Sequence, residues 1–324
     1  ERNFEISKSS KNKELSDEYL NDVQKKLSMF RLKQKMAKSV RRNKISFILG
    51  LIKNFSIIQK ENKSLYTNLK KNNIIEVYFI ILKNNIRRIT RKRFLDKNCI
   101  REISKNEKFI AYSLHFQPEF TTSFVAPFFT DQISIIRNIA RSLPIDYFLY
   151  VKEHPSMGSY LYWRTIDYYK KILEIPNVRL IHPEVDSLVF FKNASIVSTI
   201  SGSACWEALT FKKSVFAFSD VSEKVLGSVN VITELEKLPQ VIRNILKVGF
   251  IDSGCKEFFE QRFDETIDIA VPDFDQNLRD ILYLKNTEIS EPSESKFENL
   301  ITKNKEMYTV LAKEFYKKIL QYEK

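Results

Sequence analysis

Two polar clusters in the middle of the chain have the side chains that binding a phosphate requires. The first directly follows an apolar run and consists of Lys152, Glu153, His154 and Pro155. The second precedes an apolar segment and consists of Ser201, Gly202 and Ser203. An ammonium group, an imidazole, hydroxyls and the free amides at the start of a helix all donate hydrogen bonds to phosphate oxygens. We therefore expect the two clusters to form one nucleotide-phosphate site.

The second cluster also contains a glycine at a predicted turn from a strand to a helix. Gly202 is one of only six glycines in the chain, and a glycine there lets the backbone approach a ligand closely. Glu207 lies one helical turn beyond Ser203, where its carboxylate could accept hydrogen bonds from a ribose. The alternative interpretation is an ordinary serine cap, with Glu207 as the carboxylate of a capping box.

A third polar cluster follows the apolar run Phe109–Leu114 and consists of His115, Gln117, Glu119, Thr121 and Thr122. A carboxylate beside a histidine is suited to general acid or base catalysis, so His115 and Glu119 are the candidate catalytic pair. The alternative is a structural turn held by hydrogen bonds. The remaining histidine, His182, also follows a predicted strand, and a structural role fits it as well as a functional one.

Several familiar chemical motifs do not occur in the sequence. We find no P-loop, no GxGxxG, no GxSxG and no zinc-binding spacing. The three cysteines, Cys99, Cys205 and Cys255, are too widely separated for a disulfide framework or a metal site, and a reducing, cytoplasmic setting is expected. The sequence therefore predicts no metal and no other cofactor, because side chains and a helix terminus can supply the positive field that a phosphate needs.

The elements that must position these residues alternate along the chain. Strands are predicted at Phe109–Leu114, Tyr147–Val151, Val178–Ile181, Ser195–Thr199 and Ser214–Phe218. Helices are predicted between them, at Asp131–Ser142, Tyr162–Leu173, Ser187–Lys192 and Ala204–Thr210. This alternation predicts an α/β fold with a doubly wound, Rossmann-like parallel sheet. Ligands bind at the carboxyl ends of the strands in such sheets, and all three clusters lie there.

The net charge of +13 belongs to the amino-terminal third of the chain. Residues 1–100 contain 25 Lys and Arg against 9 Asp and Glu, whereas the remaining 224 residues contain 28 against 31. Residues 1–20 read as a mobile or surface segment, and the stretch from Asp22 to about Lys60 reads as basic amphipathic helices. These helices either pack on the rest of the protein or dock on an anionic membrane surface, for which residues 31–44 are the best candidate. No nucleic-acid motif accompanies the charge, so no nucleic acid is expected as a partner.

The flanking segments complete the predicted organisation. Ile74–Leu82 fits either a strand or a buried helix, and the longest apolar run, Ile45–Ile52, is too short to span a bilayer. Beyond Ser219 the pattern weakens into helices at Leu235–Lys247 and Lys256–Phe263, a linker at Ser290–Ser295 and an amphipathic helix at Phe297–Tyr322. We expect a basic helical region at 1–104, a Rossmann-like domain with a helical extension at 105–289, and a linker with a carboxy-terminal helix at 290–324.

Five segments together resemble a known family. They are His115–Glu119 with Thr121–Ser123, Asp131-Gln132, Val151–Pro155, Asn177–Leu180 and Ser201–Ala208. Over about residues 105–220 they resemble the bacterial capsule-polysaccharide synthesis family, which is similar to GT-B glycosyltransferases with two Rossmann-like domains and includes transferases of Kdo and related acidic sugars. The His-Pro pair and the serine cluster also resemble the nucleotide-binding motifs of bacterial sialyltransferases, which use CMP-activated donors.

The resemblance implies a specific activity. The expected protein is a glycosyltransferase of capsular polysaccharide synthesis that moves an acidic sugar, of Kdo or nonulosonic-acid type, from a CMP-activated donor to a glycan or glycolipid acceptor. It implies the carboxy-terminal domain of the GT-B architecture, cytoplasmic and peripheral at the membrane. The alternatives are a UDP-sugar-dependent transferase, a nucleotide-sugar epimerase, or a non-catalytic, membrane-docked component that binds capsule assembly proteins.

One departure from the family pattern concerns the amino-terminal third. The two-domain architecture would place a complete Rossmann-like domain, with the acceptor site and often the catalytic carboxylate, before residue 105. Residues 1–100 are too helical and too short for such a domain. Because the chain also begins with Glu1 rather than Met, we expect either that this domain has been removed or that a reduced helical region replaces it.

Overall fold

The computed structural model describes residues 16–25, 74–104, 106–117, 121–154, 157, 164–264, 283–284, 288–289 and 294–322. The chain divides into two compact units. The first consists of Glu1–Gln24 and Ile75–Glu257, and the second of Lys25–Ile74 and Phe258–Lys324. The three regions predicted from the sequence, 1–104, 105–289 and 290–324, have boundaries that differ from those of the two units. This division into three regions stays a prediction.

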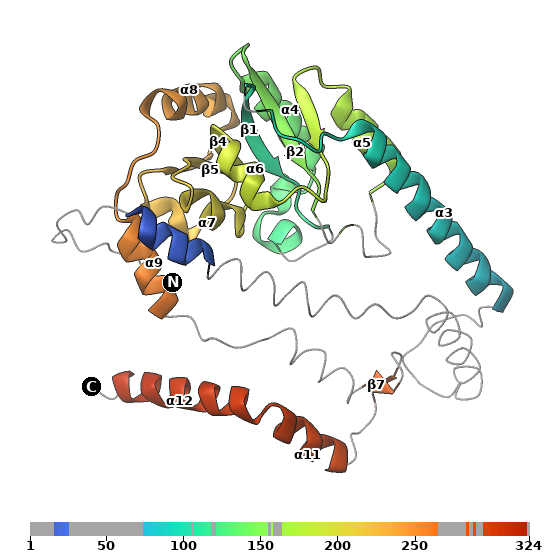
Figure 1. Cartoon of the computed structure of the whole chain (residues 1–324), viewed down its shortest axis with the longest axis vertical. Helices are drawn as coiled ribbons and strands as arrows, with labels where there is room; N and C mark the ends of the chain where they lie inside the picture. The colour runs from blue at the N-terminus through green and yellow to red at the C-terminus, as the bar shows by residue number, and fades with distance from the viewer. Residues whose placement is uncertain are drawn as a thin grey trace. The chain divides into compact units, whose positions relative to one another are not determined.

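A parallel sheet forms the centre of the first unit (Figure 1). Its six strands are β1 (Lys108–Ser113), β2 (Tyr147–Lys152), β3 (Val178–Ile181), β4 (Ile196–Thr199), β5 (Val215–Ala217) and β6 (Val229–Val231). They stand in the order β3-β2-β1-β4-β5-β6, which is the order of the Rossmann-type fold. The predicted doubly wound α/β fold is confirmed, whereas the short strand β6 was missed.

Helices connect the strands and cover both faces of the sheet. They are α4 (Gln132–Ser142), α5 (Ile166–Leu173), α6 (Ser187–Asn193), α7 (Ala204–Leu209) and α8 (Leu238–Val248). The first four were predicted, but α5 begins at Ile166 rather than at Tyr162, because Thr165 caps its amino end by accepting from the amide of Tyr168. α8 accounts for most of the helix expected at Leu235–Lys247. The first residues of that expected range, Leu235–Lys237, instead form a 3-10 turn that precedes α8.

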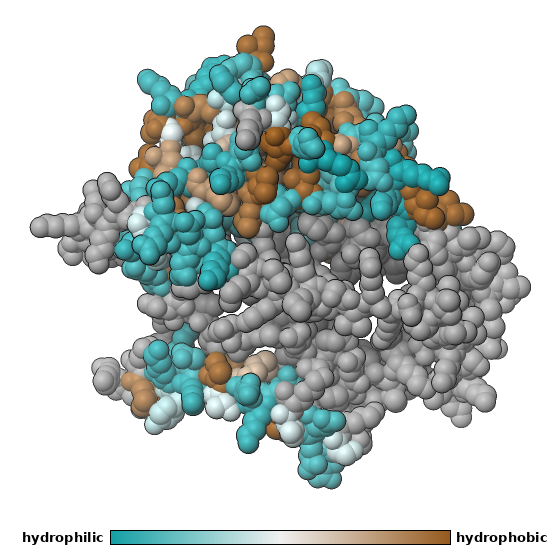
Figure 2. All heavy atoms as spheres, in the orientation of Figure 1, coloured by the Kyte–Doolittle hydropathy of each residue, from teal (hydrophilic) through white to brown (hydrophobic). Residues whose placement is uncertain are grey.

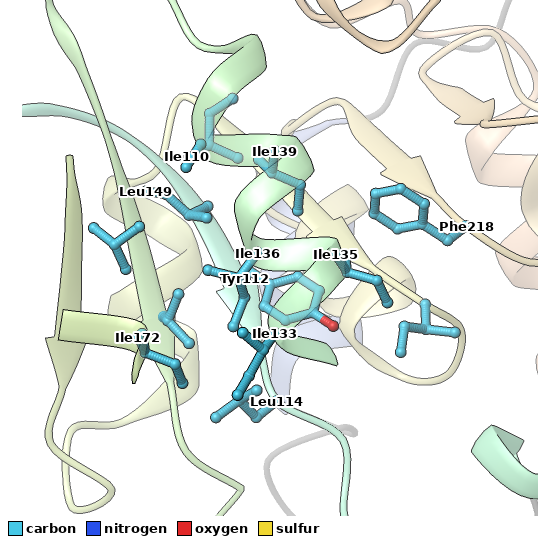
Figure 3. Packing of buried hydrophobic residues seen from close by; sticks show 14 of the residues in the cluster. Ile110, Tyr112, Leu114, Ile133, Ile135, Ile136, Ile139, Leu149, Ile172 and Phe218 are labelled. Atoms are coloured by element: carbon cyan, nitrogen blue, oxygen red, sulfur yellow. The ribbon is translucent and has the colours of Figure 1, made fainter. Parts of the chain in front are cut away.

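Alternate residues of the strands pack on opposite faces, as the two-residue period of a strand requires. Figure 3 shows the isoleucines of α4, among them Ile136 and Ile139, against Ile110 and Tyr112 of β1. On the other face, the ring of Phe109 stacks on Phe190 of α6 with a centroid distance of 6.0 Å. Both faces of the central strand are therefore buried, which explains why the strands read as continuous apolar runs.

The strand order reverses direction between β1 and β4. From β1 the chain passes outward to β2 and β3; it then returns to β4, which pairs with the other side of β1, and continues to β5 and β6. At the carboxyl ends of β1 and β4, the chain therefore leaves the two strands in opposite directions. In open α/β sheets this switch point is where ligands bind.

The first unit also contains amino-terminal helices. The segment Ile74–Leu82, for which a strand and a helix were both possible, belongs to the helix α3 (Ile74–Asn98). A second helix covers residues 17–25, and its Leu20 and Val23 are buried. Of residues 1–20, which were expected to form a mobile or surface segment, Ser16, Asp17 and Glu18 are exposed, whereas Leu20 is buried. Residues 31–44 lie outside the described residues.

The end of α3 is fastened to the sheet beside β3. The imidazole of His182, which directly follows β3, has Nε2 3.1 Å from Asp96 Oδ1, and its Nδ1 accepts a hydrogen bond of 3.2 Å from the amide of Glu184. Arg101 forms ion pairs with both Asp96 and Glu184. Because His182 is buried and both of its nitrogens have protein partners, its contacts favour the structural interpretation of this histidine.

The second unit is described at its carboxy-terminal end by α11 (Glu294–Lys303) and α12 (Lys305–Tyr322), after the short strands β7 (Tyr283–Leu284) and β8 (Glu288–Ile289). The single helix predicted at Phe297–Tyr322 is thus two helices that are interrupted at Asn304. The predicted linker ends earlier than expected, because α11 already begins at Glu294. α9 (Cys255–Asp264) confirms the helix expected at Lys256–Phe263.

Within the described ranges, none of the helices has the length and apolar character needed to cross a bilayer.

The surface of the molecule mixes polar and apolar residues, as the face in Figure 2 shows. One exposed apolar group belongs to the connection that follows β1, in the short helical turns η1 (Thr121–Val125) and η2 (Pro127–Phe129). Its side chains are those of Phe124, Val125 and Phe128. Phe129, by contrast, packs inward on Phe218 at 5.4 Å between ring centroids and anchors the segment to the core.

Candidate functional site

His115 lies at the switch point of the sheet. It follows β1 after one residue, and its Nε2 is 3.2 Å from Oγ1 of Thr199, the last residue of β4. The Thr199 hydroxyl donates its only proton to the carbonyl of Ser201 at 2.6 Å. Nε2 of His115 must therefore be the donor in its contact with Thr199. This pair of hydrogen bonds joins the carboxyl ends of the two strands that flank the switch point.

The backbone of His115 is held by the first residue of α4. The side-chain amide of Gln132 accepts a hydrogen bond of 2.8 Å from the His115 N–H and donates one of 3.2 Å to its carbonyl. Gln132 is buried, and it begins α4 because Asp131 caps that helix by accepting from the amides of Ile133 and Ser134. A capped helix thus positions the loop that carries the histidine.

A buried ion pair supports the same loop from the other side. Arg164 Nη1 lies 2.5 Å from Glu153 Oε1, and the two side chains are only 5% and 2% exposed. The other oxygen of Glu153 accepts from the Tyr169 hydroxyl at 2.6 Å. Burial lowers the pKa of Arg164, but the neighbouring Glu153 raises it, and the result lies above the ordinary value. The guanidinium group of Arg164 is therefore charged at neutral pH.

The same arginine reaches the histidine at the switch point. Arg164 Nη2 donates to the carbonyl of His115 and lies 3.5 Å from Oε1 of Gln117. Both oxygens of Glu153 accept hydrogen bonds from the protein, including one from the amide of His154. This indicates a positioning role for Glu153, whereas the sequence placed it among the ligand-binding residues.

The other members of the first polar cluster lie close by. Lys152 ends β2, and its buried ammonium donates to the carbonyl of Pro183 at 3.4 Å. The half-buried ring of His154 lies 6.0 Å from the ring of Phe116, the neighbour of His115. The loops after β1 and β2 thus lie close together, whereas a site shared by this cluster and the Ser201–Ser203 turn stays a prediction. Pro155 lies outside the described residues.

The turn after β4 lies directly against His115. Gly202 has a φ of +91°, and a Cβ atom at this position would stand 3.9 Å from Cε1 of the imidazole. The glycine is thus required by the left-handed backbone rather than by lack of space. Ser203 and Gly202 are exposed and Ser201 is partly exposed, so their hydroxyls and amides can be presented to an anionic ligand.

The serine cap that competed with this interpretation is not formed. Ser203 occupies the position before α7, but its side chain makes no capping hydrogen bond. Glu207 is buried in α7, in the interior rather than at the surface where a ribose contact was expected. The assignment of Glu207 to a ribose therefore remains a prediction that its position in this structure does not favour.

The third cluster is described only in part. The Gln117 amide donates to the carbonyl of Thr130 at 2.8 Å, which closes the connection between β1 and α4. Thr122 is completely buried, so its side chain is interior. The side chain of Thr121 and the whole of Glu119 lie outside the described residues. The catalytic pairing of His115 with Glu119 stays a prediction.

Three residues of this site were not predicted as functional: Thr199, Arg164 and Tyr169. Thr199 was read only as the end of a strand, and Arg164 precedes α5 in a stretch without any motif. Among the described residues, no three His, Cys, Asp or Glu side chains gather as a metal site would require. The site can therefore offer hydroxyl, amide and imidazole donors at one edge of the sheet, which suits the oxygens of a phosphate or carboxylate.

Comparisons with known proteins give the family. A family model described as "Capsule polysaccharide biosynthesis protein" matches residues 8–222. No curated protein matches the chain. Among solved structures, a Staphylococcus aureus MnaA–UDP co-structure shares 21% identity over 44% of this chain and 38% of its own, with a TM-score of 0.33.

Two further structures have similar values. A Thermosulfurimonas dismutans KpsC, a beta Kdo 2,4 transferase, shares 12% identity over 49% of this chain and 50% of its own, with a TM-score of 0.34. The UDP-GlcNAc 2-epimerase of Methanocaldococcus jannaschii shares 16% identity over 53% of this chain and 49% of its own, with a TM-score of 0.33. The chain thus spans about half, or less, of the length of these structures. Since the family model covers well over half of the sequence, the chain belongs to the capsule polysaccharide biosynthesis protein family.

Proposed function

We propose that this protein is a glycosyltransferase of capsular polysaccharide synthesis that uses a nucleotide-activated sugar. The observation that carries the proposal is the meeting of His115, Thr199 and the Ser201–Ser203 turn at the switch point of a β3-β2-β1-β4-β5-β6 sheet. That is the place where open α/β sheets bind nucleotides. Membership of the capsule family supports the polysaccharide as the product.

The preferred donor is a CMP-activated acidic sugar of Kdo or nonulosonic-acid type. His154 and the Ser201–Ser203 turn hold the phosphate, and Gln117, Thr121 and Thr122 belong to the loop that faces the sugar. An acceptor hydroxyl attacks the anomeric carbon while the bond from that carbon to the phosphate oxygen breaks, and CMP leaves with the electron pair. His115 or Glu119 takes the proton of the hydroxyl. Hydrogen-bond donors around the phosphate stabilise the charge that develops on the leaving group.

A binding measurement tests the phosphate site without any knowledge of the acceptor. Titration calorimetry with CMP and with UDP compares the wild type with Ser203→Ala. The matched control is Ser195→Ala, an exposed serine at the opposite, amino end of β4. A hydrogen bond to a charged group contributes about 1.5–3 kcal/mol, so Ser203→Ala should weaken nucleotide binding roughly 10- to 100-fold. Equal affinities for the two variants would refute the site.

Assays of turnover separate the proposed activity from its alternatives. Transfer of a labelled sugar from a CMP-activated donor to a glycan or glycolipid acceptor supports the proposal, and transfer from UDP-sugars alone supports the second choice of donor. Isomerisation of a free UDP-sugar without an acceptor selects a nucleotide-sugar epimerase. Binding without any turnover selects a non-catalytic component of a capsule assembly complex.

The charge of the amino-terminal third supports a location at the inner face of the cytoplasmic membrane. Residues 31–44 contain seven basic residues: Arg31, Lys33, Lys35, Lys38, Arg41, Arg42 and Lys44. Each Lys or Arg near an anionic surface contributes about 1 kcal/mol, and salt weakens the attraction. Sedimentation with anionic vesicles should recover the wild type but not the variant with all seven changed to Gln. Equal recovery with neutral vesicles would exclude docking through charge.

A further inference from the structure

A buried chain of polar contacts leads from α5 to the histidine at the switch point. Tyr169 in α5 donates to Glu153, Glu153 pairs with Arg164, and Arg164 donates to the carbonyl of His115. All three of these side chains are buried. All three lie in the connection from β2 through α5 to β3, so the chain of contacts joins this connection to the one after β1, which contains His115.

The geometry of this chain leaves Arg164 little freedom. A guanidinium group is planar, so fixing one of its terminal nitrogens also fixes the direction in which the other points. Nη1 is fixed by Glu153, whose carboxylate is itself held by Tyr169 and by the amide of His154. Nη2 is therefore directed at the carbonyl of His115, and Oε1 of Gln117 lies 3.5 Å from the same nitrogen.

Burying an ion pair contributes little to the stability of a protein, because desolvation offsets the attraction. The feature that this pair does determine is the orientation of one peptide group. The carbonyl of His115 accepts from Arg164 on one side and from Gln132 on the other. The imidazole of the same residue reaches Thr199 and the Gly202 turn. Because Gln132 also holds the N–H of His115, these contacts fix the backbone on both sides of the Cα atom from which the ring extends.

We propose that Arg164 is a positioning residue that fixes the imidazole of His115 at the switch point through the His115 carbonyl. The consequence for catalysis rests on the proposed function. The position of the ring itself does not rest on the proposed function, because it follows from the contacts of Arg164, Glu153 and Gln132.

The position of the ring can be measured directly, because the chain contains only three histidines. Labelling histidine with ¹³C and ¹⁵N gives three imidazole spin systems in NMR spectra, and His→Gln substitution of each assigns them. In Arg164→Lys, the His115 signal should shift or divide into several signals. The His182 signal should stay in place, because Asp96 and Glu184 hold that ring independently.

A matched control separates positioning from a general effect of losing a buried arginine. Arg91 is 7% exposed, against 8% for Arg164, and it likewise donates to a backbone carbonyl, that of Met157 at 3.1 Å. Arg91→Lys should leave the His115 signal unchanged. An unchanged His115 signal in Arg164→Lys, or an equal change in both variants, would overturn the proposal.

A second variant decides the matter if Arg164→Lys does not fold, which loss of the His182 signal would show. Tyr169→Phe keeps the ion pair and removes only the hydrogen bond that orients Glu153. It should displace the His115 signal in a folded protein, and no displacement would overturn the proposal. In the transfer assay, Arg164→Lys should lower kcat at least tenfold with a less than twofold change in the donor KM. A wild type without transferase activity refutes the proposed function, whereas the NMR result still decides the role of Arg164.

Discussion

The imidazole Nε2 of His115 donates to the hydroxyl of Thr199 across the switch point, 3.2 Å away. Because that hydroxyl is itself bound to the carbonyl of Ser201, one side chain of β4 connects the histidine with the turn proposed to bind phosphate. The position of the imidazole and the shape of the turn are therefore coupled through a single oxygen atom.

Replacing Thr199 by Val tests this coupling. The variant keeps the shape of the side chain but removes the hydroxyl that both hydrogen bonds use. We expect a loss of about 1–3 kcal/mol in the free energy of unfolding, because polar groups in a largely buried setting lose their partner. Urea denaturation measures the loss. Thr199→Ser, which retains the hydroxyl, is the control and should preserve nucleotide affinity. If Val and Ser bind CMP equally well, the coupling has no bearing on the turn.

A substitution at Gly202 should affect both stability and binding. Its φ of +91° is one that L side chains rarely adopt, so Gly202→Ala should cost about 1–2 kcal/mol. Gly249 at the end of α8 has a φ of +79° with open space around it, so Gly249→Ala should cost a similar amount. Only the change at Gly202 should also weaken the binding of CMP. Weakened binding in both variants would indicate a general loss of stability.

Asp131 should make the stability of the protein depend on pH in the acidic range. Hydrogen bonds from the Ser134 hydroxyl and from the amides of Ser134 and Ile133 hold the pKa of Asp131 below its usual value of 3.8. A carboxylate with a lowered pKa stabilises the fold above its usual pKa, and this contribution is lost as the pH falls through the lower, folded-state value.

Asp131→Asn keeps a capping oxygen but does not titrate. The difference in melting temperature between the wild type and this variant should therefore shrink as the pH is lowered from 6 toward 3. Asp131→Ala removes the cap and should cost about 0.5–2 kcal/mol at neutral pH. A difference between the wild type and Asp131→Asn that is constant over the whole pH range would contradict the assignment.

Ile136 provides a test of the core that supports the site. Its side chain is 0% exposed and packs from α4 against the sheet, so Ile136→Ala should lower the free energy of unfolding by about 2–5 kcal/mol. Ile145, in the connection from α4 to β2, is fully exposed, and Ile145→Ala should change stability by less than about 0.5 kcal/mol. Denaturation in urea distinguishes the two. A small effect at Ile136 would mean that α4 does not pack as described.

The sequence predicted most elements of the sheet because its strands are buried on both faces and read as apolar runs between turns. β6 was missed because Val229, Asn230 and Val231 form too short a run to stand out. The neighbours of β1 could not be predicted at all. Strand order is set by pairing between segments far apart in the chain, and no local pattern records it.

The candidate site was predicted in its location but not in the roles of its residues. His115 and Ser201–Ser203 were expected together, and the structure brings them together. Glu153 was assigned to a ligand because a carboxylate in a polar cluster looks the same in sequence whether it faces solvent or a buried partner. Its partner, Arg164, stands 11 residues further along in a segment that was predicted only as a helix. Contacts of this kind emerge only from the fold.

The reversal of strand order between β1 and β4 also has a consequence for the synthesis of the protein. His115 and Thr199 are 84 residues apart in sequence, and a ribosome adds about 5–20 residues per second. Roughly 4–17 s therefore pass between the appearance of the two halves of the site. During this interval β1 can pair with β2 but presents an open edge where β4 belongs, and open edges invite pairing with other chains. The nascent chain is thus open to such pairing at the edge of β1 until β4 has been made.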